Sequence, residues 1–168
     1  MAYTDWREPV RLLEETNGPA TPEQHDLAIL LGIPLRHGEH RKIATALLAD
    51  RVEPAIYGRE VSPATSQQLA FLEKFAKKES SFGGVSKRVA SAWIDYYLAE
   101  QAIADLRALR LERGDRVIKT EQFTFEGESP STFVHSHTVS SIGANGRVYF
   151  TGGNGAGGWP SQLRSESA

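Results

Sequence analysis

The chain has 168 residues, of which 40% are hydrophobic, and a formal net charge of −2, which allows one domain or two small ones with a real core. It contains no cysteine, which excludes disulfides and thiolate metal sites and fits either a reducing compartment or indifference to redox state. It has no apolar stretch long enough to cross a bilayer and no secretory signal at its start. We therefore expect a cytoplasmic protein without a membrane partner.

The first predicted element is an amphipathic helix near residues 4–16. Trp6, Val10 and Leu13 are spaced by four and three residues, which places them on one helical face. An Asn-Gly-Pro sequence at residues 17–19 then ends the helix. We expect this helix to pack through its apolar face.

The next segment, residues 19–58, predicts a helical hairpin. Its first helix opens with a capping box, in which Thr21 is the N-cap and Gln24 stands three residues later. Its second helix is predicted over residues 40–52, with apolar residues on one face. Pro54 should stop this helix, because proline interrupts the helical hydrogen bonds.

The same pattern then returns in the second part of the chain. Residues 63–68 repeat residues 19–24 at an offset of 44, and residues 86–94 repeat residues 40–48 at an offset of 46. The repeated features are the cap, a basic pair at the start of the second helix and a stripe of alanines. Such agreement indicates a tandem duplication, and the small residues would let the two hairpins pack closely against each other.

The second copy is predicted to end in a longer helix than the first. Apolar residues keep helical spacing after residue 94, and Gly114 supplies a C-cap, so one helix should cover residues 86–113. After it the pattern changes to β, with predicted strands at residues 117–125, 133–142 and 147–151.

These three strands predict a small antiparallel meander. The Asn145-Gly146 pair between the last two strands indicates a type I′ turn. A meander of this size is marginal alone, so we expect it to pack on the long helix.

The predicted fold class is therefore α+β, with an N-terminal all-α tandem repeat of helix hairpins followed by a small antiparallel β-meander. The expected segments are an N-terminal helix (1–18), the first hairpin (19–58), the second hairpin with its extended helix (59–114), the meander with a glycine-rich loop (115–160) and a flexible tail (161–168).

Residues 63–72 and 85–95 resemble a short helical module of unknown function that recurs in bacterial and phage proteins. The module's pattern is a threonine-containing cap with glutamine, a leucine-rich helix, then Ser/Thr-Lys, an Ala-Ser pair and Ile-Asp. The first copy matches less well, since Ala49 stands where the second copy has Asp95. The resemblance implies an accessory role beside nucleic-acid-handling proteins and brings no catalytic residue. The β-rich tail carries no such resemblance.

Six basic residues are candidates for nucleic-acid contact. Two pairs stand at the starts of the second helix of each copy, and two arginines lie on one edge of the long helix; they are Arg41, Lys42, Lys87, Arg88, Arg107 and Arg110. If the copies are related by pseudo-symmetry, the pairs could form one basic surface that meets a phosphate backbone. The alternative is a solvated face, which the acidic ends of the chain favour: residues 1–34 carry six acidic and two basic side chains.

His135 and His137 are the candidates for chemistry. Residues two apart on a strand face the same way, so the two imidazoles could share a metal or act as a general base. No third ligand lies at a suitable distance in the sequence, however. Packing beside Phe133 and Phe150 is the alternative interpretation.

Two further segments contain residue types that can bind ligands. The sequence His37-Gly38-Glu39-His40 could hold a metal, but a solvated cap at a helix start explains it better. The glycine-rich run at residues 152–158 lacks the Lys-Ser/Thr of a phosphate-binding loop. It is either a flexible tail or an ordered loop that lets Trp159 fold back on the sheet, with ligand or nucleic-acid contact as a further alternative.

The leading hypothesis is a non-catalytic accessory protein of nucleic-acid metabolism, carried by a phage or mobile element, that binds DNA, RNA or a protein acting on them. The second is a protein–protein adaptor or a self-associating structural component that uses exposed aromatics such as Trp93, Tyr96 and Tyr97. The third is a small enzyme built on the two histidines, with Glu121 or Asn154 nearby. No cofactor is expected.

Overall fold

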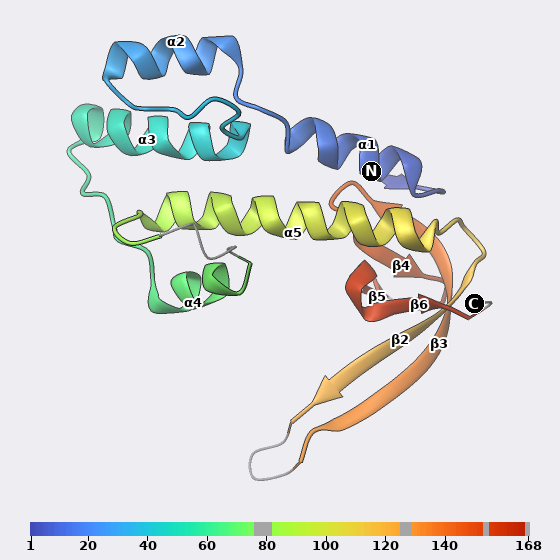
Figure 1. The fold of residues 1–168 in the computed structure, drawn as a ribbon. Helices are drawn as coiled ribbons and strands as arrows, with labels where there is room; N and C mark the ends of the chain where they lie inside the picture. Colours follow the sequence, from blue (N-terminus) through green and yellow to red (C-terminus); the bar gives the residue numbers. More distant parts are fainter. Residues whose placement is uncertain (76–81, 125–128, 153–154, 167–168) are drawn as a thin grey trace. The chain divides into compact units, whose positions relative to one another are not determined.

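The structure, a computed structural model, describes residues 1–75, 82–124, 129–152 and 155–166. Within these residues, α-helices dominate the first part of the chain and a six-stranded antiparallel sheet the last part (Figure 1). This confirms the predicted α+β class. No helix among the described residues has both the length and the apolar character needed to span a membrane.

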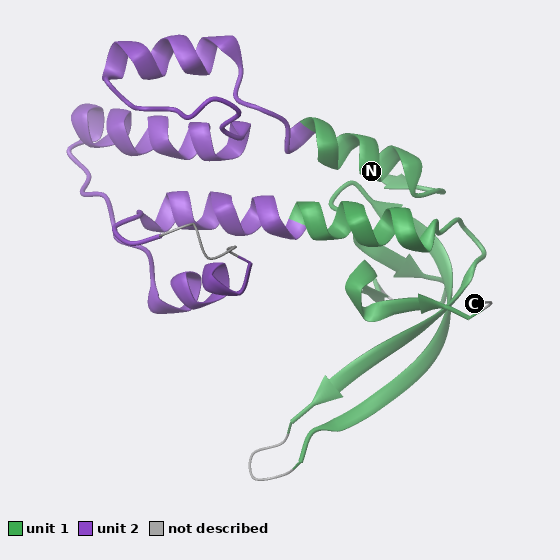
Figure 2. Cartoon of the chain, in the orientation of Figure 1, with its two compact units in different colours: residues 1–15, 99–168 green, residues 16–98 purple. Residues whose placement is uncertain are grey.

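The chain divides into two compact units (Figure 2). One, here called the helical unit, comprises residues 16–98, and the other, the sheet unit, comprises residues 1–15 and 99–168. The division differs from the expected segments, because the N-terminal helix belongs almost entirely to the sheet unit and the long helix contributes to both. The helices are α1 (Arg7–Thr16), α2 (Pro22–Leu31), α3 (Arg41–Tyr57), α4 (Ser66–Phe75) and α5 (Lys87–Leu109).

The predicted capping box of the first hairpin is present. The Thr21 backbone N–H donates to Gln24 Oε1 at 2.9 Å, and the Gln24 N–H donates to Thr21 Oγ1 at 3.3 Å. Gln24 Nε2 also donates to the carbonyl of Arg41 at 3.2 Å and to Thr45 Oγ1 at 2.8 Å. One glutamine thus caps α2 and fastens it to the first turn of α3.

The second hairpin repeats these bonds. Thr65 N–H donates to Gln68 Oε1 at 2.9 Å, and Gln68 N–H donates to Thr65 Oγ1 at 3.2 Å. Gln68 Nε2 donates to the carbonyl of Lys87 at 3.1 Å and to Ser91 Oγ at 2.9 Å. The two sequence repeats therefore form the same local structure, down to the atoms of one side chain.

A small apolar core joins α3 to α5 within the helical unit. Ile43 and Ala46 pack with Val89 and Ala92, which stand 46 residues further along the chain. Two further contacts join equivalent pairs of positions in the two copies. His40 stacks on Tyr96, with ring centroids 3.8 Å apart, and Ser86 donates to the carboxylate of Asp50. Because residue 86 corresponds to 40 and residue 96 to 50, the two copies pack about a pseudo-twofold axis, with α3 and α5 antiparallel.

The predicted ends of both long helices are wrong. α3 continues through Pro54 to Tyr57 and ends at Gly58, which has a φ of 64° and donates to the carbonyl of Pro54. The proline removes one helical hydrogen bond near the end of α3. The burial of apolar side chains along the rest of the helix outweighs this loss. α5 ends at Leu109, before the expected Gly114 cap, since the chain turns at Arg110 (φ 51°) to bury Leu111.

The sheet has the strand order β5-β4-β3-β2-β6, with β1 also paired to β3. β2, β3 and β4 are the predicted meander, although the end expected at Phe125 lies outside the described residues. The expectation of three strands is wrong, because three further strands of two or three residues pair with the meander. These strands are too short to show an alternating pattern in the sequence. The strands are β1 (Ala2–Tyr3), β2 (Arg116–Phe123), β3 (Ser131–Gly143), β4 (Val148–Phe150), β5 (Gly157–Gly158) and β6 (Leu163–Ser165).

The expectation of a flexible tail over residues 161–168 is wrong for residues 161–166, while residues 167–168 lie outside the described residues. Pro160–Gln162 forms a 3-10 turn, and β6 pairs with β2. Leu163 is buried in the main apolar cluster, so burial of one leucine holds this end of the chain. β5 belongs to the glycine-rich run. A Cβ at Gly157 would lie 2.4 Å from the carbonyl oxygen of Val148, so glycine is needed there for the strands to approach.

The turn between β3 and β4 is not type I′. Gly146 N–H donates to the carbonyl of Gly143, which places Ala144 and Asn145 at the turn centre. A type I′ turn needs positive φ at both central residues, whereas Arg110 is the one non-glycine residue with positive φ in the described parts of the chain. Gly146, with a φ of 83°, follows the turn instead.

Gly146 is also packed tightly, which gives a test of the sheet unit. A Cβ there would lie 3.2 Å from Ala102 Cβ and 3.4 Å from Leu13 Cδ1. We expect Gly146→Ala to lower the free energy of unfolding by about 1–3 kcal/mol, from backbone strain and overpacking together. Urea unfolding would measure it. Gly58→Ala, also at positive φ but with nothing within 4 Å, is the control for strain alone, and equal losses would contradict the packing contribution.

Candidate functional site

The basic pairs at the starts of α3 and α5 do not meet. His40 at the start of α3 stacks on Tyr96, whereas Arg88 at the start of α5 reaches Glu53 on α3. Residues 88 and 96 are eight apart, or about 12 Å along a helix. The antiparallel packing therefore puts Arg41 and Lys42 at one end of the helix pair, and Lys87 and Arg88 at the other.

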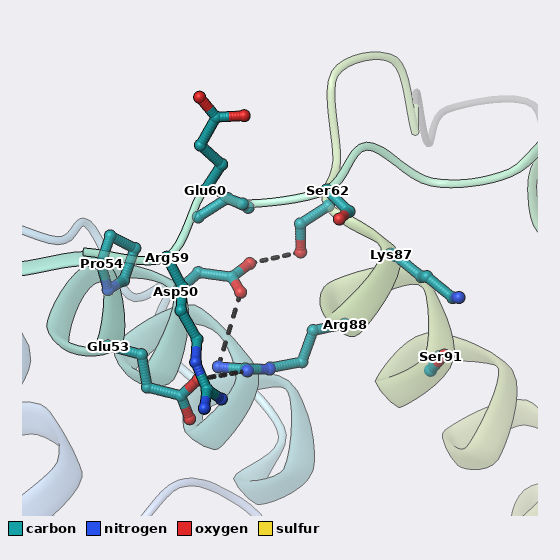
Figure 3. A pocket seen from close by; sticks show the side chains of 11 residues that line it. Asp50, Glu53, Pro54, Arg59, Glu60, Ser62, Lys87, Arg88 and Ser91 are labelled. Atoms are coloured by element: carbon teal, nitrogen blue, oxygen red, sulfur yellow. Dashed lines mark hydrogen bonds and ion pairs between the residues drawn. The ribbon is translucent and has the colours of Figure 1, made fainter. Parts of the chain in front are cut away.

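Arg88 is held by acidic side chains of α3. Its Nη2 lies 2.5 Å from Glu53 Oε2, and its Nη1 lies 3.7 Å from Asp50 Oδ1 (Figure 3). The hydrogen bond to Glu53 raises the pKa of Arg88 above its ordinary value. The charge expected to meet a phosphate is thus largely compensated within the helical unit.

A pocket of about 400 Å³ lies beside this ion pair, with Lys87 and Ser91 on its far side (Figure 3). The buried Ser86 donates to Asp50 and accepts the N–H of Val89 at 3.0 Å, so its hydroxyl is an N-cap with both roles filled. The pocket is lined by both acidic and basic residues, and none of its lining residues is a histidine. This arrangement caps and joins helices, and it lacks a base that would activate the serine.

The two candidate arginines of the long helix belong to the sheet unit and differ from each other. Arg107 forms an ion pair with Glu14 of α1. Arg110 is exposed and occupies the turn at the end of α5. The six basic candidates are therefore divided between the two units.

His135 and His137 share a face of β3, as predicted, with ring centroids 6.2 Å apart. His137 stacks almost parallel on Phe150, with ring centroids 4.2 Å apart. Burial, followed by the nearby charges of His135 and Lys119, lowers the pKa of His137. These contacts favour packing as the role of His137.

Of the rest of the proposed catalytic set, Glu121 lies near both histidines, as expected, but a lysine already engages its carboxyl. Glu121 pairs with Lys119, and this hydrogen bond lowers the pKa of the carboxyl, with smaller contributions from the charges of the two histidines. Among the described residues, no three His, Asp or Glu side chains are grouped in a way that could hold a metal ion. Asn154 lies outside the described residues. His37 and His40, the other metal candidates, flank a loop in which His40 packs against Tyr96 and Trp93.

The sequence did not reveal that α2 presents apolar side chains to solvent. Leu27, Ile29 and Leu30 are 41%, 76% and 83% exposed, while Ala28 between them is buried. The signal was present in the apolar run of residues 27–31. Five consecutive apolar residues cannot all face one side of a helix, so some of them had to point outward.

Exposed apolar side chains also lie on the ribbon formed by β2 and β3. Phe123 and Phe133 share one face of the ribbon, where they are 47% and 45% exposed and their ring centroids lie 5.7 Å apart. Val134, which is 55% exposed, lies on the opposite face. Figure 1 shows this ribbon extending beyond β4, β5 and β6 of its own sheet.

The chain matches no protein-family model, no curated protein and no solved structure. The features of the described residues that bear on function are the exposed apolar side chains and the ion-paired arginines.

Proposed function

We propose that this protein is a non-catalytic accessory protein that binds a partner protein through the outward face of α2. The observation that carries the proposal is the exposure of Ile29 and Leu30, at 76% and 83%. Single exposed apolar residues are ordinary, but neighbouring ones on one helix are typical of a binding surface. Burying each of them would contribute roughly 2 kcal/mol.

The charge around these residues supports a particular kind of partner. Glu23, Asp26 and Leu30 lie on the same outward face of α2, since they are three and four residues apart. An acidic and apolar helix face fits an apolar groove with a basic rim. Proteins that handle nucleic acids carry basic surfaces, so the proposed partner agrees with the company that the module resemblance implies.

The ion pairs of Arg88 and Arg107 weigh against direct binding of DNA or RNA. Each of these side chains already has a carboxylate partner, and a phosphate would have to displace it. Direct binding of nucleic acid was expected to use one compact basic face. The basic pairs lie instead at opposite ends of the helix pair formed by α3 and α5. Protein binding is therefore the better supported half of the original hypothesis.

The test is to capture partners with the whole chain by cross-linking, purify the protein that is captured, and titrate it calorimetrically against wild type and Leu30→Lys. We expect Leu30→Lys to weaken binding about tenfold or more, because it removes apolar area and places a positive charge where a basic rim is expected to bind. Ile56→Lys, at another exposed apolar position of the helical unit (64%), is the matched control and should bind normally.

Binding should also weaken as salt rises, since a basic rim is screened. Equal binding by Leu30→Lys would remove α2 as the site. Retention on heparin and a DNA shift at low salt, both lost in the double variant Arg41→Glu with Lys42→Glu, would instead favour direct nucleic-acid binding.

A further inference from the structure

The outer edge of β3 lacks a partner strand along its first half. On one side β3 pairs with β2 over residues 131–138; on the other, β4 pairs with it only from Val139 onward. No other strand in the described parts of the chain pairs with residues 131–137 on the β4 side. This leaves a free sheet edge seven residues long.

The direction of the free backbone groups follows from the bonds around Val139. Its N–H donates to the carbonyl of Asp115, and its carbonyl accepts from Gly114 N–H, so both groups face the β2 side. The carbonyl of Thr138 faces the other way and accepts from Thr151 N–H. Backbone direction alternates along an antiparallel strand, so Thr132, Val134 and Ser136 point their N–H and carbonyl groups out from the free edge.

In the part of the chain that the structure describes, this edge has none of the features that usually prevent strand pairing. Proteins protect edges with charged residues, prolines, bulges or a covering segment. Residues 131–138 have the sequence Ser-Thr-Phe-Val-His-Ser-His-Thr, without a lysine, arginine, acid or proline. The bulge of β3 comes later, between Val139 and Ser141.

The ribbon would also gain stability from a third and fourth strand. A two-stranded hairpin is marginal in water, and three or more strands are needed for independent stability. Beyond Lys119, where β6 stops pairing with β2, the described ribbon consists of β2 and β3 alone. A partner strand at the edge would also cover part of Val134, which is 55% exposed.

We propose that this protein forms a homodimer in which the free edge of β3 pairs antiparallel with the same edge of a second copy, centred on Val134. Twofold pairing places each residue opposite a residue of the identical segment, so a charge at the axis would meet itself. The segment contains no lysine, arginine or acidic residue, so no such repulsion arises. Centring on Val134 pairs the outward-facing Thr132 with Ser136 and sets Phe133 across from His135, an aromatic pair of the kind that stabilises sheets.

The proposal is independent of the α2 surface. The continuous sheet that results would have the order β2-β3-β3-β2, with the two β3 strands at its centre. A strand supplied by a different protein would use the same backbone groups, and it is distinguished by the oligomeric state of the purified chain.

The test is multi-angle light scattering of the whole chain over a range of concentrations. We expect wild type to dimerise and Val134→Lys to raise the dissociation constant about tenfold or more, because two lysines would meet at the axis. Thr120→Lys is the matched control, since Thr120 stands opposite Val134 on β2 and adds the same charge to the same face of the ribbon. It should dimerise like wild type, with circular dichroism confirming that both variants fold.

A second measurement uses the absence of cysteine from the chain. Val134→Cys should form an intermolecular disulfide on mild oxidation, since directly opposed residues of an antiparallel pair lie within disulfide reach, whereas Thr120→Cys should not. A wild type that stays monomeric up to millimolar concentration, equal effects of the two lysine variants, or equal cross-linking of the two cysteine variants would each overturn the proposal.

Discussion

Leu106→Ala should lower the free energy of unfolding by about 2–5 kcal/mol, the largest effect we expect from a single apolar truncation in this protein. Leu106 is fully buried in the sheet unit. It packs in the cluster that joins α1 and α5 to the sheet, which includes Val117 and Ile142, and its Cδ1 lies near the backbone of Gly146. A cavity at this point would be bordered by both helices and by the β3–β4 turn, which limits how far the surroundings can collapse.

Chemical unfolding followed by circular dichroism would measure this loss. Leu98→Ala is the matched control, because it makes the same chemical change in the same helix at a residue that is 45% exposed. The control should cost less than about 1 kcal/mol. Similar losses from the two substitutions would contradict the placement of Leu106 at the centre of the core.

Asp50→Ala should cost about 1.5–3 kcal/mol, the second largest effect that we expect. The Asp50 carboxylate accepts the hydroxyl of Ser86 and approaches Arg88, and its side chain is only 18% exposed. Removing it leaves the N-cap serine of α5 with an unsatisfied donor and weakens the link between the two repeats.

A double-mutant cycle with Ser86→Ala would isolate this contact. We expect the double variant to lose clearly less stability than the sum of the single variants, because both remove the same hydrogen bond. Asp50→Asn, which keeps an acceptor but not the charge, should lose less than Asp50→Ala. Strictly additive losses would show that the serine and the aspartate act separately.

The packing of α3 against α5 is the reason why the basic surface was predicted incorrectly. The repeats indicated that Lys42 and Arg88 stand at equivalent positions, and the contacts of the helical unit agree with that equivalence. The direction of α3 relative to α5 was not encoded in the repeat itself. Antiparallel packing separates equivalent helix starts, whereas parallel packing would have brought them together.

For the candidate sites, too, the sequence predicted some features, whereas others depended on tertiary packing. The shared face of His135 and His137 followed directly from the two-residue period of a strand. Whether that face held a metal or a packed ring depended on Phe150, which reaches His137 only because β4 folds back on β3. The exposed run on α2 was visible as an apolar sequence, but which of its residues faced outward depended on the packing of Ala28 and Gln24 against the rest of the unit.

The sequence by itself determined the local structure of this protein: the helix caps at Thr21 and Thr65, the β-meander and the repeat of one hairpin pattern. These features depend on hydrogen bonds and side-chain periods within a few residues, so they can be read in order along the chain. Tertiary structure decided the pairing of Ser86 with Asp50, the strand formed by Leu163–Ser165 and the free edge of β3. Each of these joins or exposes segments far apart in sequence, and burial in a common core, rather than local preference, fixes where such segments meet.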